Sequence, residues 1–197
     1  MRRTLTILVV ALLAIAAAFA QATDIEYNDG SKYQGDVAGG KPNGNGSITF
    51  ADGATYTGQW KDGVIRGTGV FVFAGGGRYE GEFAAGVFSG KGTFTLANGD
   101  RYEGAFKNGK PEGSGVYAWA ADSSRLEATF AAASPQGKGT LYLANGDRIV
   151  GDFTKWKLGA DVTYYWKDGD SFQGKLVAGA LRTGWLFRKD GTKYPVD

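Results

Sequence analysis

Cysteine and histidine are both absent from this chain of 197 residues. Without cysteine, the chain can form neither a disulfide nor a thiolate nucleophile. Without histidine, it lacks the commonest general base, every histidine-containing catalytic triad and the usual ligand sets for zinc, copper and non-haem iron. We therefore expect a protein that is not an enzyme, that binds no metal or other cofactor, and that is stabilised by strand pairing and aromatic packing.

An excess of charge of one sign is also lacking. The chain carries 22 Lys and Arg against 20 Asp and Glu, and removal of residues 1–20 would take away only Arg2 and Arg3 and leave 20 of each sign. A neutral chain does not create the strong positive potential that attracts nucleic acids. We therefore expect no nucleic-acid partner. Only the C-terminal part leans basic, through residues such as Lys155, Lys157 and Lys189.

The one long apolar run lies at the N-terminus. Arg2-Arg3 precedes an apolar stretch over 5–18, and Ala18-Phe19-Ala20 has the small-x-small pattern of a signal-peptidase site. This order is typical of a secretory signal peptide. We predict that residues 1–20 are cleaved, that the mature chain begins at Gln21, and that the protein is periplasmic or secreted. An uncleaved membrane anchor is the alternative, although the run is shorter than the ~20 residues that span a bilayer.

Glycine, by contrast, is abundant, with 33 residues, and much of it is periodic. A tyrosine recurs every 23 residues, a glycine follows it two positions later, and a Gly-x-Gly pair recurs in phase. The tyrosines are Tyr33, Tyr56, Tyr79 and Tyr102, and the pairs are Gly44/Gly46, Gly67/Gly69, Gly90/Gly92 and Gly113/Gly115. A fixed period between about 20 and 50 residues is typical of an array built from one supersecondary unit.

Each repeat contains two stretches with the alternation of a β-strand. Tyr79-Glu80-Gly81-Glu82-Phe83 places Tyr, Gly and Phe on one face and both glutamates on the other, and Gly92-Thr93-Phe94-Thr95-Leu96 alternates again. Such alternation predicts strands. Between units, dipeptides such as Asp52-Gly53 and Asn98-Gly99 supply the positive φ angles of tight turns. Each unit is therefore predicted to be a β-hairpin.

Hairpins stacked edge to edge predict an all-β fold, an elongated single-layer antiparallel meander of about seven 23-residue units. Residues 21–197 form this array, with regular units over about 27–119 and degenerate units over about 120–188. In the degenerate part, the tyrosine position is taken by Leu126, Ile149 and Phe172. Residues 189–197 are expected to cap the array, because terminal repeats must cover its end.

The regular units resemble the MORN (membrane occupation and recognition nexus) repeat. The resemblance is carried by Tyr79-Glu80-Gly81-Glu82-Phe83 with Gly90-Lys91-Gly92-Thr93-Phe94, and by Tyr102-Glu103-Gly104-Ala105-Phe106 with Gly113-Ser114-Gly115-Val116-Tyr117. It extends over about 27–194. The resemblance implies an all-β array of hairpins that serves as a scaffold, a dimerisation module or a membrane-associated module, and it does not imply an activity of its own. Together with the predicted signal peptide, it indicates an exported bacterial type.

The apolar face of this sheet is the candidate binding surface. A single-layer sheet has no second layer to cover its apolar face, and a contiguous exposed apolar strip marks an interaction site. We predict a non-enzymatic scaffold that binds a protein partner or the envelope membrane, with a second copy of the chain as a further candidate partner. The predicted binding residues are Tyr33, Tyr56, Trp60, Tyr79, Phe83, Tyr102 and Phe106.

Other functions are weaker alternatives. Glycan binding would use the same aromatic rings as a stacking surface, and it requires that Trp60, Trp119 and Trp166 be exposed. Paired carboxylates such as Glu80 and Glu82 can hydrolyse glycosides when one is desolvated, but these are expected on the solvent face. Asp168-Gly169-Asp170 could contribute to a calcium site, yet it lacks EF-hand spacing, and an ordinary turn is favoured.

Overall fold

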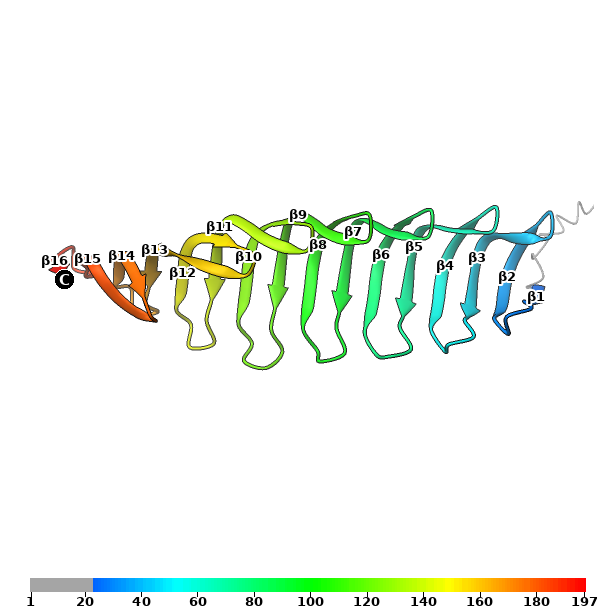
Figure 1. Cartoon of the computed structure of the whole chain (residues 1–197), viewed down its shortest axis with the longest axis horizontal. Helices are drawn as coiled ribbons and strands as arrows, with labels where there is room; N and C mark the ends of the chain where they lie inside the picture. Colours follow the sequence, from blue (N-terminus) through cyan, green and yellow to red (C-terminus); the bar gives the residue numbers. More distant parts are fainter. Residues whose placement is uncertain (1–22) are drawn as a thin grey trace, which may run out of the picture.

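The computed structural model describes residues 23–197, so the predicted signal peptide lies outside the described residues. Within this range, sixteen strands form one antiparallel sheet in which every strand pairs with its neighbours in the sequence. The strands lie side by side along an elongated molecule, with β1 and β16 at opposite ends (Figure 1). The predicted all-β, single-layer meander is confirmed.

The strands alternate between shorter and longer members over most of the array. Their bounds are β1 (Thr23–Glu26), β2 (Lys32–Ala38), β3 (Lys41–Thr49), β4 (Thr55–Lys61), β5 (Val64–Val72), β6 (Arg78–Ala84), β7 (Val87–Thr95), β8 (Arg101–Lys107), β9 (Lys110–Ala118), β10 (Arg125–Ala131), β11 (Ser134–Tyr142), β12 (Arg148–Thr154), β13 (Lys157–Tyr165), β14 (Ser171–Val177), β15 (Ala180–Phe187) and β16 (Lys193–Val196). The pairs from β2–β3 to β14–β15 are seven hairpins, which agrees with the predicted number of units. β1 and β16 add one strand at each end.

Two kinds of turn join the strands, and the sequence indicated only one of them. Inside the units, two-residue turns such as Ala85-Gly86 have positive φ at both positions, 50° and 79°, which is the geometry of a tight hairpin turn. Between the units, the predicted Asn98-Gly99 lies in a wider turn closed by a bond from the Leu96 N–H to the Asp100 carbonyl. The tight hairpin turns therefore lie within the units, and the Asn-Gly dipeptides join one unit to the next.

A row of glycines crosses the sheet at the middle of the strands. Gly81 pairs with Gly69 on one side and with Gly92 on the other, and the row runs from Gly35 on β2 to Gly184 on β15, interrupted only by Ala128 and Val162. Within every hairpin, the register shifts directly after the row on the first strand. Such bulges bend and twist a strand, and the upper hairpin ends in Figure 1 curve away from the straighter lower half.

The glycine row makes room for the repeated tyrosines. A Cβ added at Gly92 would lie 2.4 Å from the Tyr79 hydroxyl oxygen and 2.6 Å from its Cζ, so the ring lies directly on this glycine. The Tyr79 hydroxyl donates to the carbonyl of Glu82, at 2.9 Å, in the bulge. Gly90, the first glycine of the same Gly-x-Gly pair, has φ of 59° within the bulge. The two glycines of the pair therefore have different roles, one for backbone conformation and one for ring packing.

A second row, two residues from the glycines, forms the apolar face. It begins Ile25, Tyr33, Ile48, Tyr56, Phe71, Tyr79, Phe94, Tyr102 and Tyr117 and continues through Leu126 to Tyr194, with each residue paired to the next across the sheet. From Tyr33 to Phe172, the members on the first strand of each hairpin are buried. Leu126, Ile149 and Phe172 thus occupy the tyrosine position, as predicted.

Candidate binding surface

The seven predicted binding residues form the hydrophobic core of the array. Tyr33, Tyr56, Trp60, Tyr79, Phe83, Tyr102 and Phe106 are each at most 8% exposed. Their rings pack edge to face along the sheet, with Tyr79 at 5.1 Å from Phe83 and 5.0 Å from Phe106. These side chains are therefore buried within the folded array itself. Their role in binding stays a prediction, which can be tested through the accessible residues beside them.

The polar atoms of these core residues are satisfied internally. The Trp60 indole N–H donates to the carbonyl of Gly46 at 3.2 Å, and the Tyr56 hydroxyl donates to the carbonyl of Gln59 at 3.0 Å. Burial raises the pKa of Tyr56, Tyr79 and Tyr102 to about 12. These hydroxyls thus act as fixed donors to the backbone and offer nothing to a ligand.

The accessible part of the apolar face is a strip of half-buried rings. We define the aromatic strip as Phe50, Phe71, Phe73, Phe94, Tyr117 and Trp119. Neighbouring rings are in contact along it: Phe50 lies 5.8 Å from Phe71, Phe71 lies 4.7 Å from Phe73, and Phe73 lies 5.6 Å from Phe94. Tyr117 and Trp119 lie 5.0 Å apart further along the array. The strip thus follows the long axis from β3 to β9.

None of the seven predicted binding residues belongs to the aromatic strip. Phe71, Phe94 and Tyr117 lie on the second strand of their hairpins, opposite the repeated tyrosines. The signal that could have found them is the register itself, because the 23-residue spacing of each of these positions matches the spacing of the tyrosines. When the two strands of a hairpin are paired through their central glycines, Phe71, Phe94 and Tyr117 fall in the same row as the repeated tyrosines.

The three tryptophans on which glycan stacking was predicted to depend are not fully exposed. Trp60 is buried, whereas Trp119 and Trp166 are half-buried. Trp119 packs against Tyr117 at 5.0 Å, and Trp166 packs against Tyr164 at 4.9 Å. No helix within residues 23–197 has the length and apolar character to cross a membrane.

The opposite face carries the predicted ladder of acids. Glu80, Glu103 and Glu127 line a shallow trough of about 940 Å³ that follows the glycine row. Each pairs with an arginine two residues earlier on its own strand, at 2.7 Å for Arg78–Glu80 and Arg101–Glu103 and 3.4 Å for Arg125–Glu127. Exposed pairs of this kind contribute little stability. The arginines leave the trough mixed in charge. The side chains of Glu80, Glu103 and Glu127 are 57%, 60% and 44% exposed, so none of these three carboxylates is desolvated as glycoside hydrolysis requires.

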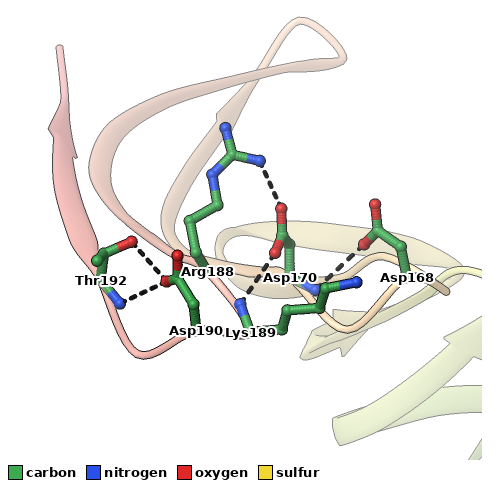
Figure 2. Close-up of polar contacts among 6 residues, drawn as sticks. All are labelled: Asp168, Asp170, Arg188, Lys189, Asp190 and Thr192. Atoms are coloured by element: carbon green, nitrogen blue, oxygen red, sulfur yellow. Dashed lines mark hydrogen bonds and ion pairs between the residues drawn. The ribbon is translucent and has the colours of Figure 1, made fainter.

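The carboxylates at the candidate calcium turn hold the backbone. The Asp170 Oδ1 accepts from the N–H of Lys189 at 3.0 Å, and its Oδ2 accepts from Arg188 at 2.6 Å. Asp168 accepts from the N–H of Asp170, and Asp190 binds Thr192 in the next turn (Figure 2). These backbone bonds, together with Arg188, hold the pKa of Asp170 below its usual range. Figure 2 thus shows Asp170 joining two successive turns.

The same position joins turns elsewhere in the array. Asp100 accepts from the N–H of Ala120 at 2.9 Å and from the Tyr117 hydroxyl at 2.7 Å, and Asp147 accepts from Lys167 N–H and the Tyr164 hydroxyl. These bonds lower the pKa of both carboxyls. We call Asp100, Asp147 and Asp170 the turn aspartates. They are buried, and they have a structural role that sequence reasoning did not identify.

Comparison with solved structures shows the same fold in proteins of unrelated sequence. The Drosophila melanogaster SAS-4 (dCPAP) TCP domain, in complex with a proline-rich motif of Ana2, is 13% identical with a TM-score of 0.53, and the match covers 100% of this chain and 98% of that one. The wild-type TCP10 domain of Danio rerio CPAP, in complex with a peptide of Danio rerio STIL, is 12% identical with a TM-score of 0.55, and the match covers 90% of this chain and 79% of that one. No curated protein sequence matches the chain.

The repeat family is identified by sequence. The family model described as "MORN repeat" matches residues 33–55, 56–78, 79–101, 102–124 and 134–148, together more than half of the chain. The first four matches each begin at one of the repeated tyrosines, Tyr33, Tyr56, Tyr79 and Tyr102. They therefore coincide with the ring-over-glycine units of the structure. The chain belongs to the MORN repeat family.

Proposed function

We propose that this protein is a non-enzymatic scaffold that binds a protein partner along the aromatic strip. The observation that carries the proposal is the continuity of half-buried rings over Phe50, Phe71, Phe73 and Phe94, on a sheet that no second layer covers within residues 23–197. Aromatic rings supply large contact area at low cost in side-chain entropy. The solved complexes of the same fold with peptides of Ana2 and STIL support a peptide-binding use of such a sheet.

The proposal includes export. The apolar run over 5–18 and the Ala18-Phe19-Ala20 pattern support a signal peptide. A cleaved signal peptide would place the scaffold in the periplasm or outside the cell. Its partner there would be an envelope protein or the envelope membrane. N-terminal sequencing of the protein recovered from the envelope fraction should give Gln21. An intact Met1 there would instead indicate a retained anchor.

Site-specific photo-crosslinking tests the binding face. A photoreactive phenylalanine analogue at Phe73 or Trp119, at the accessible margin of the aromatic strip, should capture a protein partner in cells. The matched controls are the same analogue at Glu80 and Glu103, which lie on the opposite face in the trough. Capture from the controls alone would contradict the proposal. Capture of a second copy of this chain from the strip would identify self-association as the function of the strip.

Glycan binding is the weaker alternative because Trp60 is buried.

A further inference from the structure

Trp156 has a backbone conformation that tryptophan rarely adopts. It is the second residue of the two-residue turn between β12 and β13, with φ of 67°. At this turn position, five other hairpins have a glycine with positive φ: Gly40, Gly63, Gly86, Gly109 and Gly179. A side chain in this region is sterically disfavoured, and such outliers cluster at binding and active sites. The conformation therefore calls for an explanation in what the ring contacts.

The Trp156 ring folds back along the array toward the end of the aromatic strip. Its centroid lies 4.9 Å from Tyr117, 5.9 Å from Phe130 and 6.2 Å from Trp119. Despite these contacts, Trp156 is 42% exposed. The ring forms one wall of a cavity of about 230 Å³, whose other walls include Phe94, Phe106, Pro111, Tyr117 and Phe130.

The cavity offers no free polar group. The Tyr117 hydroxyl donates to Asp100 at 2.7 Å, and the Tyr102 hydroxyl, from another lining residue, donates to the carbonyl of Ala105 at 3.1 Å. An occupant must therefore be apolar. Rings surround the space, and they favour edge-to-face contact with another ring.

The volume indicates one side chain of a larger partner. A cavity of about 150 Å³ in another protein accepts benzene, whereas sites that enclose a whole small ligand begin near 300 Å³. The cavity here, at about 230 Å³, lies between the two. Anchoring a single aromatic side chain in such a pocket is the usual way in which a partner obtains most of its binding energy.

Lysines flank the cavity along the chain. Lys110 precedes Pro111, and Lys155 and Lys157 stand on either side of Trp156. All three are exposed, and none takes part in the salt bridges found among residues 23–197. The acid that follows Pro111, Glu112, is already bonded to the N–H of Ala132. Glu112 keeps its negative charge in this bond, but the three lysines outnumber it. Acidic residues on a partner would therefore complement the positive charge that adjoins Pro111 and Trp156 in the chain.

We infer that the cavity beside Trp156 anchors one aromatic side chain of a protein partner, in a segment where acidic residues flank that side chain. This inference rests on the proposed protein-binding function and assigns its anchor point. Trp156 forms the outer wall, the rings of Tyr117 and Phe130 line the interior, and the three lysines select the acidic flanks.

Two synthetic peptides test the anchor on the mature chain, Asp-Glu-Phe-Glu-Asp and Asp-Glu-Ala-Glu-Asp, with binding measured by NMR titration. The phenylalanine peptide should bind at least ten-fold more tightly than the alanine peptide, and Trp156→Gly should abolish that preference. Trp156→Gly places in the turn the residue that five other hairpins use, so the fold should be retained, as thermal unfolding would check. The matched control is Trp185→Ala, which removes a tryptophan of similar exposure, 43%, on β15 and should change nothing.

Three results would overturn the inference: equal affinity for both peptides, no binding of either up to millimolar concentration, or a preference that survives Trp156→Gly. Binding of anionic vesicles in place of the peptides, with the same dependence on Trp156, would also overturn it by assigning the cavity to lipid. Failure here is distinct from failure of the proposed function. Crosslinking from Phe73, which does not line the cavity, reports on the strip whether or not the anchor exists.

Discussion

Tyr79 is packed so closely against Gly81 and Gly92 that no larger residue fits at either glycine while the ring stays in place. A Cβ at Gly81 would lie 2.5 Å from the Cα of Gly92, 2.6 Å from the carbonyl oxygen of Lys91 and 2.6 Å from the Tyr79 hydroxyl oxygen. Two of these three atoms belong to the backbone of the paired strand and cannot move aside. The glycine in the repeated Tyr-x-Gly pattern is therefore a steric requirement of the strand pairing as well as of the ring.

Substitution at Gly81 tests this packing. Gly81→Val should lower the free energy of unfolding by about 3 kcal/mol, at the upper end of the range for overpacked cores. The exposed Ala97, in the turn between units, provides the control, and Ala97→Val should change stability by no more than about 0.5 kcal/mol. Urea unfolding measures both. Equal shifts of the unfolding midpoint would show that the ring-over-glycine account is wrong.

The buried tyrosines predict a loss of stability at high pH. Burial raises the pKa of Tyr56, Tyr79 and Tyr102 to about 12, whereas an unfolded tyrosine titrates near 10. Between these values the folded chain binds more protons than the unfolded chain, so stability is complete below pH ~10 and falls as the pH rises toward ~12. Urea midpoints measured from pH 9 upward should show this decline, and Tyr79→Phe should make it shallower. A constant midpoint across the interval would contradict the prediction.

At the scale of elements, the turn aspartates predict the opposite dependence in acid. The Ala120 N–H and the Tyr117 hydroxyl lower the pKa of Asp100, and the Tyr164 hydroxyl and the Lys167 N–H lower that of Asp147. Their contribution to stability is present above the unfolded pKa of about 4 and is lost as the pH falls through the lower folded values. Asp147→Asn should lower the urea midpoint at pH 7 and flatten its acid dependence. An unchanged slope below pH 5 would contradict the role of the turn aspartates.

The sequence predicted the strands well because several independent patterns in each repeat indicate the same structure. The alternation in Tyr79–Phe83, the Gly-x-Gly pairs and the 23-residue period all indicate the same hairpin, and the structure agrees. The tight turns were harder to find, because residues such as Ala132-Ala133 and Lys155-Trp156 adopt positive φ without a glycine. Their conformation follows from the register of the flanking strands, which local residue preferences do not reveal.

The candidate site was predicted only in part for a similar reason. The sequence identifies which residues share the apolar face, but the burial of Tyr79 or Phe83 depends on how far the sheet bends at the bulges. That bend brings rings such as Phe88 onto Tyr79, 3.9 Å apart and stacked. The turn aspartates were missed because Asp100 and Asp147 look like ordinary turn residues until the next unit is placed beside them.

At the scale of the whole molecule, each unit contacts mainly the units beside it. Strands make most of their contacts with the strands adjacent in the sequence, so the stability of the array should be close to a sum over units and their interfaces. Deletion of 79–101, one complete 23-residue unit, joins Arg78 to Tyr102 in the same register. The shortened chain should fold with the same far-UV circular dichroism per residue and a modestly lower melting temperature. Loss of folding would show that the array depends on long-range contacts.

Binding through the aromatic strip is the central claim, and one measurement tests it most directly. Recruitment of the crosslinked partner should be compared between Phe73→Ser with Trp119→Ser and the opposite-face control Glu80→Gln with Glu103→Gln, after circular dichroism has shown that both variants are folded. We predict that the strip variant loses recruitment and that the control keeps it. Because the chain is neutral without residues 1–20, contact along the aromatic strip itself should change little between about 0.05 M and about 0.3 M salt, whereas any attraction of acidic residues by the exposed Lys110, Lys155 and Lys157 should weaken. Recruitment that survives in the folded strip variant would contradict the account.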